Sequence, residues 1–397
     1  MPEPSWLSIP LGLALLVLGL LDVFLTVLHV QVESPISNRL NRQLWRLLLT
    51  ITRPLPRPLR DDALAWGLPL MIVTDIGFWI LLAVAGFALL YLPLLSDPAS
   101  FTLTEARTAW PLVDALYFSG ASFFTLGYGD IAPLHPLARL LAVLEGAAGL
   151  LTLSLAVTYL LSVYPFITRK TALAAALNQE TAGRADGVVT AQRYLAADRF
   201  DALAERLRWI NDELLALGQA HGLYPVLFYV RPRIVHESFI RALAVTQGLV
   251  GTLRYATDTR AHPEIASDPR LIMLEEGLLY TLHNLQRSSH LAGSPSDVSV
   301  DGDGPGGACF GEALDSQRVR LGLAAAPERP EDAAARASFR RFRQATDPII
   351  CTYAAAVDYD PRDVWATYNR WARDSALEPG PDAQPRTPGI HNMSETS

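Results

Sequence analysis

Three long apolar runs lie in the first 165 residues of the chain, and the remaining residues mostly mix apolar and polar positions as soluble helices do. The runs cover about residues 7–30, 68–95 and 137–164. Each is long enough to cross the roughly 30 Å hydrocarbon core of a bilayer as a helix. The first run is too long for a signal peptide and contains Asp22, so we interpret it as a membrane span. The pattern predicts three transmembrane helices followed by a soluble region.

The charges beside these runs predict their orientation. The segment after the first run carries six arginines, whereas the N-terminal segment carries no basic residue and residues 96–107 are nearly neutral. The third run is followed by Arg169 and Lys170. Cytoplasmic loops are enriched in Lys and Arg, so we expect the N-terminus outside the cell and the C-terminal half in the cytoplasm. The protein is then a multi-pass protein of the plasma or inner membrane.

The arginine-rich segment mixes Leu, Trp and Arg along residues 38–51. This pattern fits an amphipathic helix that lies on the inner face of the membrane. It fits a plain linker equally well, so both interpretations stay open.

Between the second and third runs lie about forty residues that contain a short glycine-rich motif. Residues 110–124 are apolar and too short to span, so they predict a half-length re-entrant helix. The motif Thr125-Leu126-Gly127-Tyr128-Gly129 follows it directly. Glycine permits positive φ, so successive carbonyl groups of this motif can point the same way and replace the hydration shell of a cation. Such irregular backbone at membrane depth is tolerated where it is buried in protein or lines a watery cavity.

The stretch T-L-G-Y-G-D, with the half-helix before it and I-A-P and an apolar helix after it, resembles the potassium channel pore. The resemblance covers about residues 68–165 and is to bacterial channels with two-helix pores, here with one extra N-terminal helix. It implies K⁺ coordination by Thr125, Leu126, Gly127 and Tyr128, with Gly129 completing the selectivity filter. Asp130 then lies at the outer mouth, and Gly149 takes the place of a gating-hinge glycine. Because each chain carries one motif and a ring of oxygens needs four, we expect a homotetramer.

The position before the filter departs from this family, which usually has Thr or Ser where this chain has Phe124. We expect the change to affect the stability of the filter more than its selectivity. Two rival functions remain: a weakly selective cation channel, and a membrane sensor or scaffold whose pore is vestigial.

Ionisable residues occur inside the first two runs, where they are costly and usually face protein or water. Asp22, Thr26 and His29 share one helix face. They predict either a stripe sensitive to protons or cations or, as we favour, a hydrogen-bonded seam between helices. We expect Asp75 to pair with His29 or with an arginine of the inner loop, in a packing role.

Glu145 lies one helical turn before Gly149 in the third run. It either faces the cavity and attracts cations or turns behind the filter and bonds to the half-helix. We favour the second arrangement, in which Glu145 and Gly149 support the pore.

The soluble half predicts a helical domain. Apolar residues from Leu203 to Leu217 recur at spacings of four and three, which indicates an amphipathic helix. A helix-bundle core is the default interpretation, and a coiled coil that assists assembly is the alternative. Residues 224–232 predict a lone buried extended segment. Further helices are predicted at residues 236–255, 269–291, 331–354 and 362–376.

The composition narrows the function further. The net charge of −7 argues against nucleic acid as a partner, because phosphate binding needs a clustered positive face. The two cysteines are too few for a disulfide framework or a metal cluster. No catalytic constellation is apparent, so we expect no enzyme and no cofactor beyond K⁺ as the permeant ion. Residues 301–312 read either as a calcium loop or, as we favour, as a disordered loop. The sequence names no gating ligand.

The predicted fold class is an all-α membrane protein with three transmembrane helices, a re-entrant pore helix and filter, and a helical cytoplasmic regulatory domain. Its expected partners are further copies of itself, membrane lipid and K⁺. The predicted units are an N-terminal transmembrane helix (1–32), an arginine-rich interfacial linker (33–64), a pore domain (65–166), the cytoplasmic domain (167–376, with a disordered loop at 292–308) and a disordered tail (377–397).

Overall fold

The computed structural model of the chain describes residues 7–27, 34–97, 99–103, 110–258, 262–288, 314, 317–321 and 330–366. The elements in the membrane-associated half are α1 (Ser8–Val27), α2 (Pro35–Thr52), α3 (Arg57–Ala65), α4 (Gly67–Leu95), β1 (Phe101–Leu103), α5 (Pro111–Phe123), β2 (Ile131–Pro133) and α6 (Pro136–Glu180). Those that follow are α7 (Val188–Ala196), α8 (Phe200–Leu223), η2 (Pro225–Tyr229), η3 (Val235–Glu237), α9 (Phe239–Gly251), η4 (Thr252–Ala256), α10 (Pro263–Ala266), α11 (Pro269–Ser288), α13 (Pro330–Ala356) and α14 (Pro361–Trp365). The predicted all-α membrane fold is confirmed. The calcium-loop hypothesis, the predicted loop at 292–308 and the tail lie outside the described residues.

Helices α1, α4 and α6 are the three elements of the described chain that are long and apolar enough to cross a membrane, as predicted. Helices α1 and α4 approach each other closely through Gly12 and Gly86. A Cβ atom on Gly12 would lie 2.7 Å from the carbonyl oxygen of Gly86, so any larger residue would push the two helices apart. Small residues at such crossings let apolar helices pack tightly where no hydrophobic driving force operates between them.

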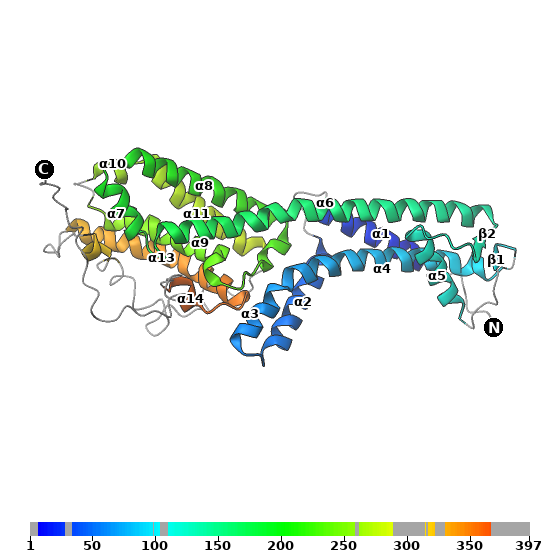
Figure 1. The fold of residues 1–397 in the computed structure, drawn as a ribbon. Helices are drawn as coiled ribbons and strands as arrows, with labels where there is room; N and C mark the ends of the chain where they lie inside the picture. The colour runs from blue at the N-terminus through cyan, green and yellow to red at the C-terminus, as the bar shows by residue number, and fades with distance from the viewer. Residues whose placement is uncertain are drawn as a thin grey trace, which may run out of the picture.

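At one end of the bundle, farthest from the soluble helices, α5 and a short β ribbon pack beside α4 and α6 (Figure 1). The ribbon pairs β1 with β2 in antiparallel fashion, with Phe101 opposite Pro133. Phe101 lies edge-on to Phe118 of α5 at 5.2 Å and to Tyr91 of α4 at 6.2 Å. This aromatic cluster fixes α5 against α4. The sequence did not predict the ribbon, because each of its strands has only three residues.

Helix α6 runs without a break from the pore into the soluble half (Figure 1). The sequence predicted the apolar span to end near Tyr164 and the cytoplasmic domain to start at 167, but the helix continues to Glu180. Beyond the apolar part, one face of α6 is buried against the soluble helices through Leu173, Ala174 and Leu177. The helix therefore changes from lipid-compatible to amphipathic without ending, and Pro165 is accommodated inside it.

The segment between α1 and α4 is not a plain linker. Its amphipathic pattern forms α2, whose Ser37, Asn41 and Trp45 are buried at spacings of four residues. The Trp45 ring lies 5.5 Å from that of Tyr229, and its indole N–H donates to the carbonyl of Ala356 at 2.9 Å. Helix α2 thus packs between the outer helix α4 and the soluble domain.

Helix α3 carries charges of both signs, and they pair with the soluble domain. Arg60 Nη2 lies 2.5 Å from Asp358 Oδ1, and Asp61 Oδ1 lies 2.5 Å from Arg231 Nη2. The Arg231 side chain is 1% exposed and also donates to the carbonyl of Val357 at 2.8 Å. More exposed pairs surround these two: Arg57–Asp360, Arg57–Asp363 and Arg233–Asp62.

The soluble helices share one apolar core. The repeated leucines of α8, from Leu203 to Leu217, are all buried within a single chain, mainly against α11. Their burial agrees with the bundle-core interpretation and leaves no apolar face of α8 for a coiled coil. The predicted extended segment at 224–232 is wrong, because its first half forms the 3-10 helix η2. No strand lies beside it in the described chain, so its buried N–H groups pair locally instead, as Leu227 does with the carbonyl of Tyr224 at 2.9 Å.

A buried network fixes the soluble end of α6. Lys170, the only lysine of the chain, donates to the carbonyl of Leu227 at 2.7 Å and lies 2.9 Å from His221 Nε2. His221 Nδ1 lies 2.7 Å from the carbonyl of Leu217, so the neutral ring donates there and accepts from the lysine. Burial, and then the nearby Lys170, lower the pKa of His221 well below its usual value.

Candidate functional site

The backbone of the glycine-rich motif alternates in conformation. The φ angles of Thr125, Gly127 and Gly129 are 55°, 62° and 81°, while Leu126 and Tyr128 between them do not have positive φ. Positive φ is uncommon for a residue with a side chain, so Thr125 adopts a strained conformation that its surroundings must hold. The alternation is the one that the motif predicts for carbonyl groups directed to one side.

The motif is joined directly to the end of α5. The N–H of Leu126 donates to the carbonyl of Ala121 at 2.8 Å, and that of Thr125 to the carbonyl of Ser122 at 3.0 Å. The Thr125 hydroxyl donates to the carbonyl of Phe124 at 2.8 Å. The partial negative charge at the C-terminal end of α5 therefore lies beside Thr125, where it favours a cation.

One side of the motif is exposed in the single chain. A Cβ atom placed on Gly127 or Gly129 would meet no atom within 4 Å. Phe124, Leu126 and Tyr128 are 56%, 54% and 67% exposed, an unusual exposure for large side chains in the middle of an apolar segment. The ring of Phe124 packs edge-on against Phe123 at 5.4 Å, and Asp130 after the motif is half-buried.

Glu145 of α6 lies behind the motif and not on a free face of the helix. Its side chain is fully buried and accepts a hydrogen bond from the Tyr91 hydroxyl of α4 at 2.9 Å. Its other oxygen contacts the Ser119 hydroxyl of α5, which also contacts the carbonyl of Val84 at 2.8 Å. Glu145 thus connects the pore helix to both neighbouring helices, in the arrangement that we favoured. Sequence reasoning missed Tyr91, because nothing in its local pattern marks it as a partner.

Gly149 has a packing role that the family resemblance did not indicate. A Cβ atom there would collide with the carbonyl of Phe123 at the end of α5, so the glycine lets α6 approach the pore helix. Helix α6 is continuous through Gly149. The role of Gly149 as a gating hinge stays a prediction.

The carboxylate of Asp22 belongs to a hydrogen-bonded seam. It accepts hydrogen bonds from the hydroxyls of Ser34 and Ser37 and, at 2.8 Å, from the indole N–H of Trp79. This seam joins α1, α2 and α4, as the favoured interpretation expected for Asp22, whereas the Thr26 hydroxyl takes no part in it. His29 lies outside the described residues.

Asp75 forms no ion pair with an arginine among the described residues, so the arginine alternative was wrong, and the other expected partner, His29, lies outside them. Its carboxylate accepts from the Asn41 side-chain amide at 2.9 Å. The reason lies in the phase of α2: Asn41 is on the buried face, whereas Arg39 and Arg46 are exposed. The spacing of Ser37, Asn41 and Trp45 by four residues was the signal in the sequence for this buried face.

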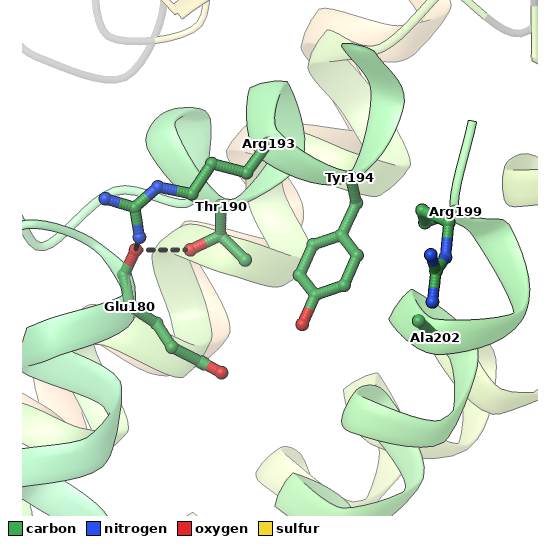
Figure 2. Close-up of a pocket in the computed structure, with 6 residues that line it drawn as sticks. All are labelled: Glu180, Thr190, Arg193, Tyr194, Arg199 and Ala202. Carbon is green, nitrogen blue, oxygen red and sulfur yellow. Dashed lines mark hydrogen bonds between the residues drawn. The ribbon is translucent and has the colours of Figure 1, made fainter. Parts of the chain in front are cut away.

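The soluble domain holds a pocket of about 250 Å³ between the end of α6, α7 and α8 (Figure 2). Both the hydroxyl of Thr190, at 3.3 Å, and the guanidinium of Arg193, at 2.9 Å, donate to the carbonyl oxygen of Glu180. These donors satisfy a carbonyl at the C-terminal end of α6, where basic side chains commonly cap helices. The pocket residues therefore fix the end of α6 against α7.

Comparisons with known proteins agree with this arrangement. Residues 76–164 match a family model described as an ion channel, and this range contains the motif, Glu145 and Gly149. Over 253 residues the chain is 30% identical to the uncharacterized membrane protein YdjJ of Bacillus subtilis (strain 168). This alignment covers 64% of this chain and 71% of YdjJ. The chain belongs to the ion channel family. It is a membrane protein, and this family is not a class of enzymes.

A second relative is a named channel. Over 111 residues the chain is 34% identical to the inward rectifier potassium channel Kirbac3.1 of Paramagnetospirillum magnetotacticum. The alignment covers 28% of this chain and 34% of Kirbac3.1, so the chain spans about a third of that protein. No solved structure matches the chain significantly.

Proposed function

We propose that four copies of this chain form a potassium-selective channel through which K⁺ moves passively down its gradient. The observation that carries the proposal is the alternation of positive φ at Thr125, Gly127 and Gly129 directly after the pore helix. In such a strand, carbonyl oxygens of Thr125 to Tyr128 stack into successive rings when four copies meet on one axis. The similarity to Kirbac3.1, a potassium channel by name, supports the same ion.

The exposure of the filter supports assembly into a tetramer. One chain supplies one filter strand and leaves Leu126 and Tyr128 more than half exposed. Closed rotational symmetry would bring these residues against neighbouring copies and place the carbonyl groups around the axis. The outer surfaces of α1 and α4 would then contact lipid.

The orientation follows from charge and from the position of the two ends. The filter and β ribbon lie at one end of the spans and the soluble helices at the other (Figure 1). The arginine-rich helices α2 and α3 lie on the side of the soluble helices, which supports a cytoplasmic position for that side. The N-terminus and Asp130 then face outward, and Asp130 concentrates cations at the outer mouth.

The soluble domain is positioned to regulate the pore. It continues directly from the inner helix α6 and is also held to α3, and hence to the outer helix α4, by the Arg231–Asp61 ion pair. A rearrangement of this domain would therefore change the position of α6 relative to α4, the two helices on either side of the filter.

Reversal potentials of the purified protein in planar bilayers test this function. A tenfold K⁺ gradient against Na⁺ corresponds to about 1.4 kcal/mol, which a potential of roughly 60 mV balances for one charge. We expect a reversal potential near this value and loss of the current in Gly127→Ala.

Two other results would contradict the proposal. A reversal potential near zero with K⁺ on one side and Na⁺ on the other would indicate the weakly selective channel that Phe124 allows. An absence of flux in the intact protein would favour the sensor or scaffold with a vestigial pore.

A further inference from the structure

A small polar cavity lies where the membrane helices meet the soluble domain, apart from the filter. Its volume is about 20 Å³, enough for one water-sized body. Its walls come from six elements or their ends: α1, α2, α4, α6, α8 and η2. The residues that line it are Leu25, Thr26, Ser34, Ser37, Asn38, Asn41, Asp75, Tyr159, Leu223, Tyr224, Pro225 and Val226.

Within the described part of the chain, three oxygen atoms of residues in the walls of this cavity lack a hydrogen-bond partner. They are the hydroxyl oxygen of Thr26, the side-chain carbonyl oxygen of Asn41 and one carboxylate oxygen of Asp75. Asp75 is fully buried and Asn41 is 3% exposed. An unpartnered buried polar atom is costly, and three that line one cavity indicate a shared ligand.

Among the described residues, the charge of the cavity is also unbalanced. Asp75 has one hydrogen-bond donor, Asn41, and forms no ion pair among the described residues. Asp22 is bound by Ser37, one turn before Asn41 on the same face of α2, so the two carboxyl groups lie near each other. Neither has a basic partner in the described part of the chain. A buried carboxylate needs a compensating positive charge or a proton.

We propose that this cavity is a binding site for one monovalent cation of about the size of Na⁺, separate from the conduction pathway. Its ligands are oxygen atoms of Asp75, Asn41 and Thr26, the donor type that hard cations prefer. One carboxylate faces the cavity, which matches a single positive charge. A divalent ion would carry one more positive charge than this single carboxylate compensates.

A cation is favoured over the two simpler occupants. A water molecule would satisfy the three oxygens but leave the charge of Asp75 uncompensated. A proton on Asp75 would remove that charge and supply one O–H donor, which can satisfy one of the oxygens of Asn41 and Thr26 but not both. A bound cation would both contact the three oxygens and compensate the charge of Asp75.

Occupancy of the site would link the inner helix to the outer helix. Tyr159 of α6 lies in the wall beside Asp75 of α4, and its ring is 6.2 Å from both Trp79 and Tyr224. Movement of α6 relative to α4 at this level changes the shape of the cavity. The cation concentration on the soluble side would therefore bias the position of α6.

Thermal unfolding of the full-length protein in lipid nanodiscs tests this proposal. Na⁺ replaces a bulky organic cation at constant ionic strength, with K⁺ held constant at a concentration that saturates the filter. We expect a saturable rise in Tm of roughly 1–2 °C when Na⁺ is about five times its dissociation constant. Asp75→Asn should lose the rise, and Thr26→Val should weaken the apparent Na⁺ affinity at least about fivefold.

Two controls separate this site from other effects. Thr74→Val removes a hydroxyl that bonds to its own helix at Leu70 and should keep the full response. Gly127→Ala alters the filter and should also keep it, so failure of conduction does not affect this test. Wild-type protein whose Tm ignores Na⁺, or follows pH instead, would overturn the proposal. An unchanged Na⁺ response in both Asp75→Asn and Thr26→Val would overturn it as well.

Discussion

Replacement of Glu145 by alanine is the sharpest test of how the filter is supported. In the native chain this carboxyl group connects α6 to Tyr91 of α4 and to Ser119 of α5. Ser119 lies only six residues before Thr125, within the helix that continues into the filter. Glu145→Ala removes both contacts and leaves the Tyr91 hydroxyl buried without this acceptor.

The expected cost follows from these two hydrogen bonds. A buried hydrogen bond contributes about 0.5–1.5 kcal/mol, or about 1.5–3 kcal/mol when one partner is charged, and an unpaired buried hydroxyl adds a desolvation cost. We therefore expect a loss of about 2–3 kcal/mol in each subunit. Because about 1.4 kcal/mol is a factor of ten, the equilibrium between ordered and disordered filter shifts roughly 30- to 150-fold.

Single-channel recordings in planar bilayers measure this shift as a fall in open probability, and tetramer unfolding measures it as a lower Tm. Glu145→Gln keeps an acceptor for Tyr91 and a donor toward Ser119, so its departure from wild type reports the loss of the carboxyl group alone. Leu144→Ala, at a 51% exposed neighbour, is the matched control. Wild-type open probability and Tm in Glu145→Ala would refute this account of filter support.

Three further outcomes follow from the described contacts. Gly149→Ala should cost about 1–3 kcal/mol by overpacking against the end of α5, seen as a reduced yield of tetramer, and a normal yield would contradict the packing role. Arg231→Ala should cost about 2–3 kcal/mol in thermal unfolding, because the side chain is 1% exposed and its loss leaves the Val357 carbonyl and the partly exposed Asp61 carboxylate without this donor, whereas the exposed Arg233→Ala should cost under about 1 kcal/mol; equal effects would contradict this difference. The lowered pKa of His221 means that the unfolded chain binds the proton more readily, so stability should fall as the pH drops through about 6.5; a slope in this range that His221→Gln does not reduce would exclude His221 as the cause.

The sequence predicted those parts of the fold that depend on local pattern. Uninterrupted apolar runs are sufficient to place α1, α4 and the first part of α6, because lipid imposes no other requirement on such helices. The glycines at 127 and 129 likewise indicated a backbone of alternating conformation. The family match supports an ion channel, and its ion selectivity stays a prediction.

Other features depend on contacts between distant segments. The β ribbon and the 3-10 helix η2 form because of what lies beside them, so neither follows from local propensity. The partner of Asp75 depends on which face of α2 is buried, and Arg39 and Arg46 on that helix are exposed. The closeness of Gly149 to the carbonyl of Phe123 required the packing of two helices that sequence alone does not orient.

The continuity of α6 fixes the rotation and the distance of the soluble domain relative to the pore. At about 1.5 Å and 100° per residue, one residue inserted after Tyr164 would rotate Leu173 and Leu177 away from the soluble core. Seven inserted residues would nearly restore the rotation but lengthen the helix by about 10 Å, which would pull Arg231 from Asp61. Chimeras between such channels therefore need a junction that preserves both helical phase and helix length.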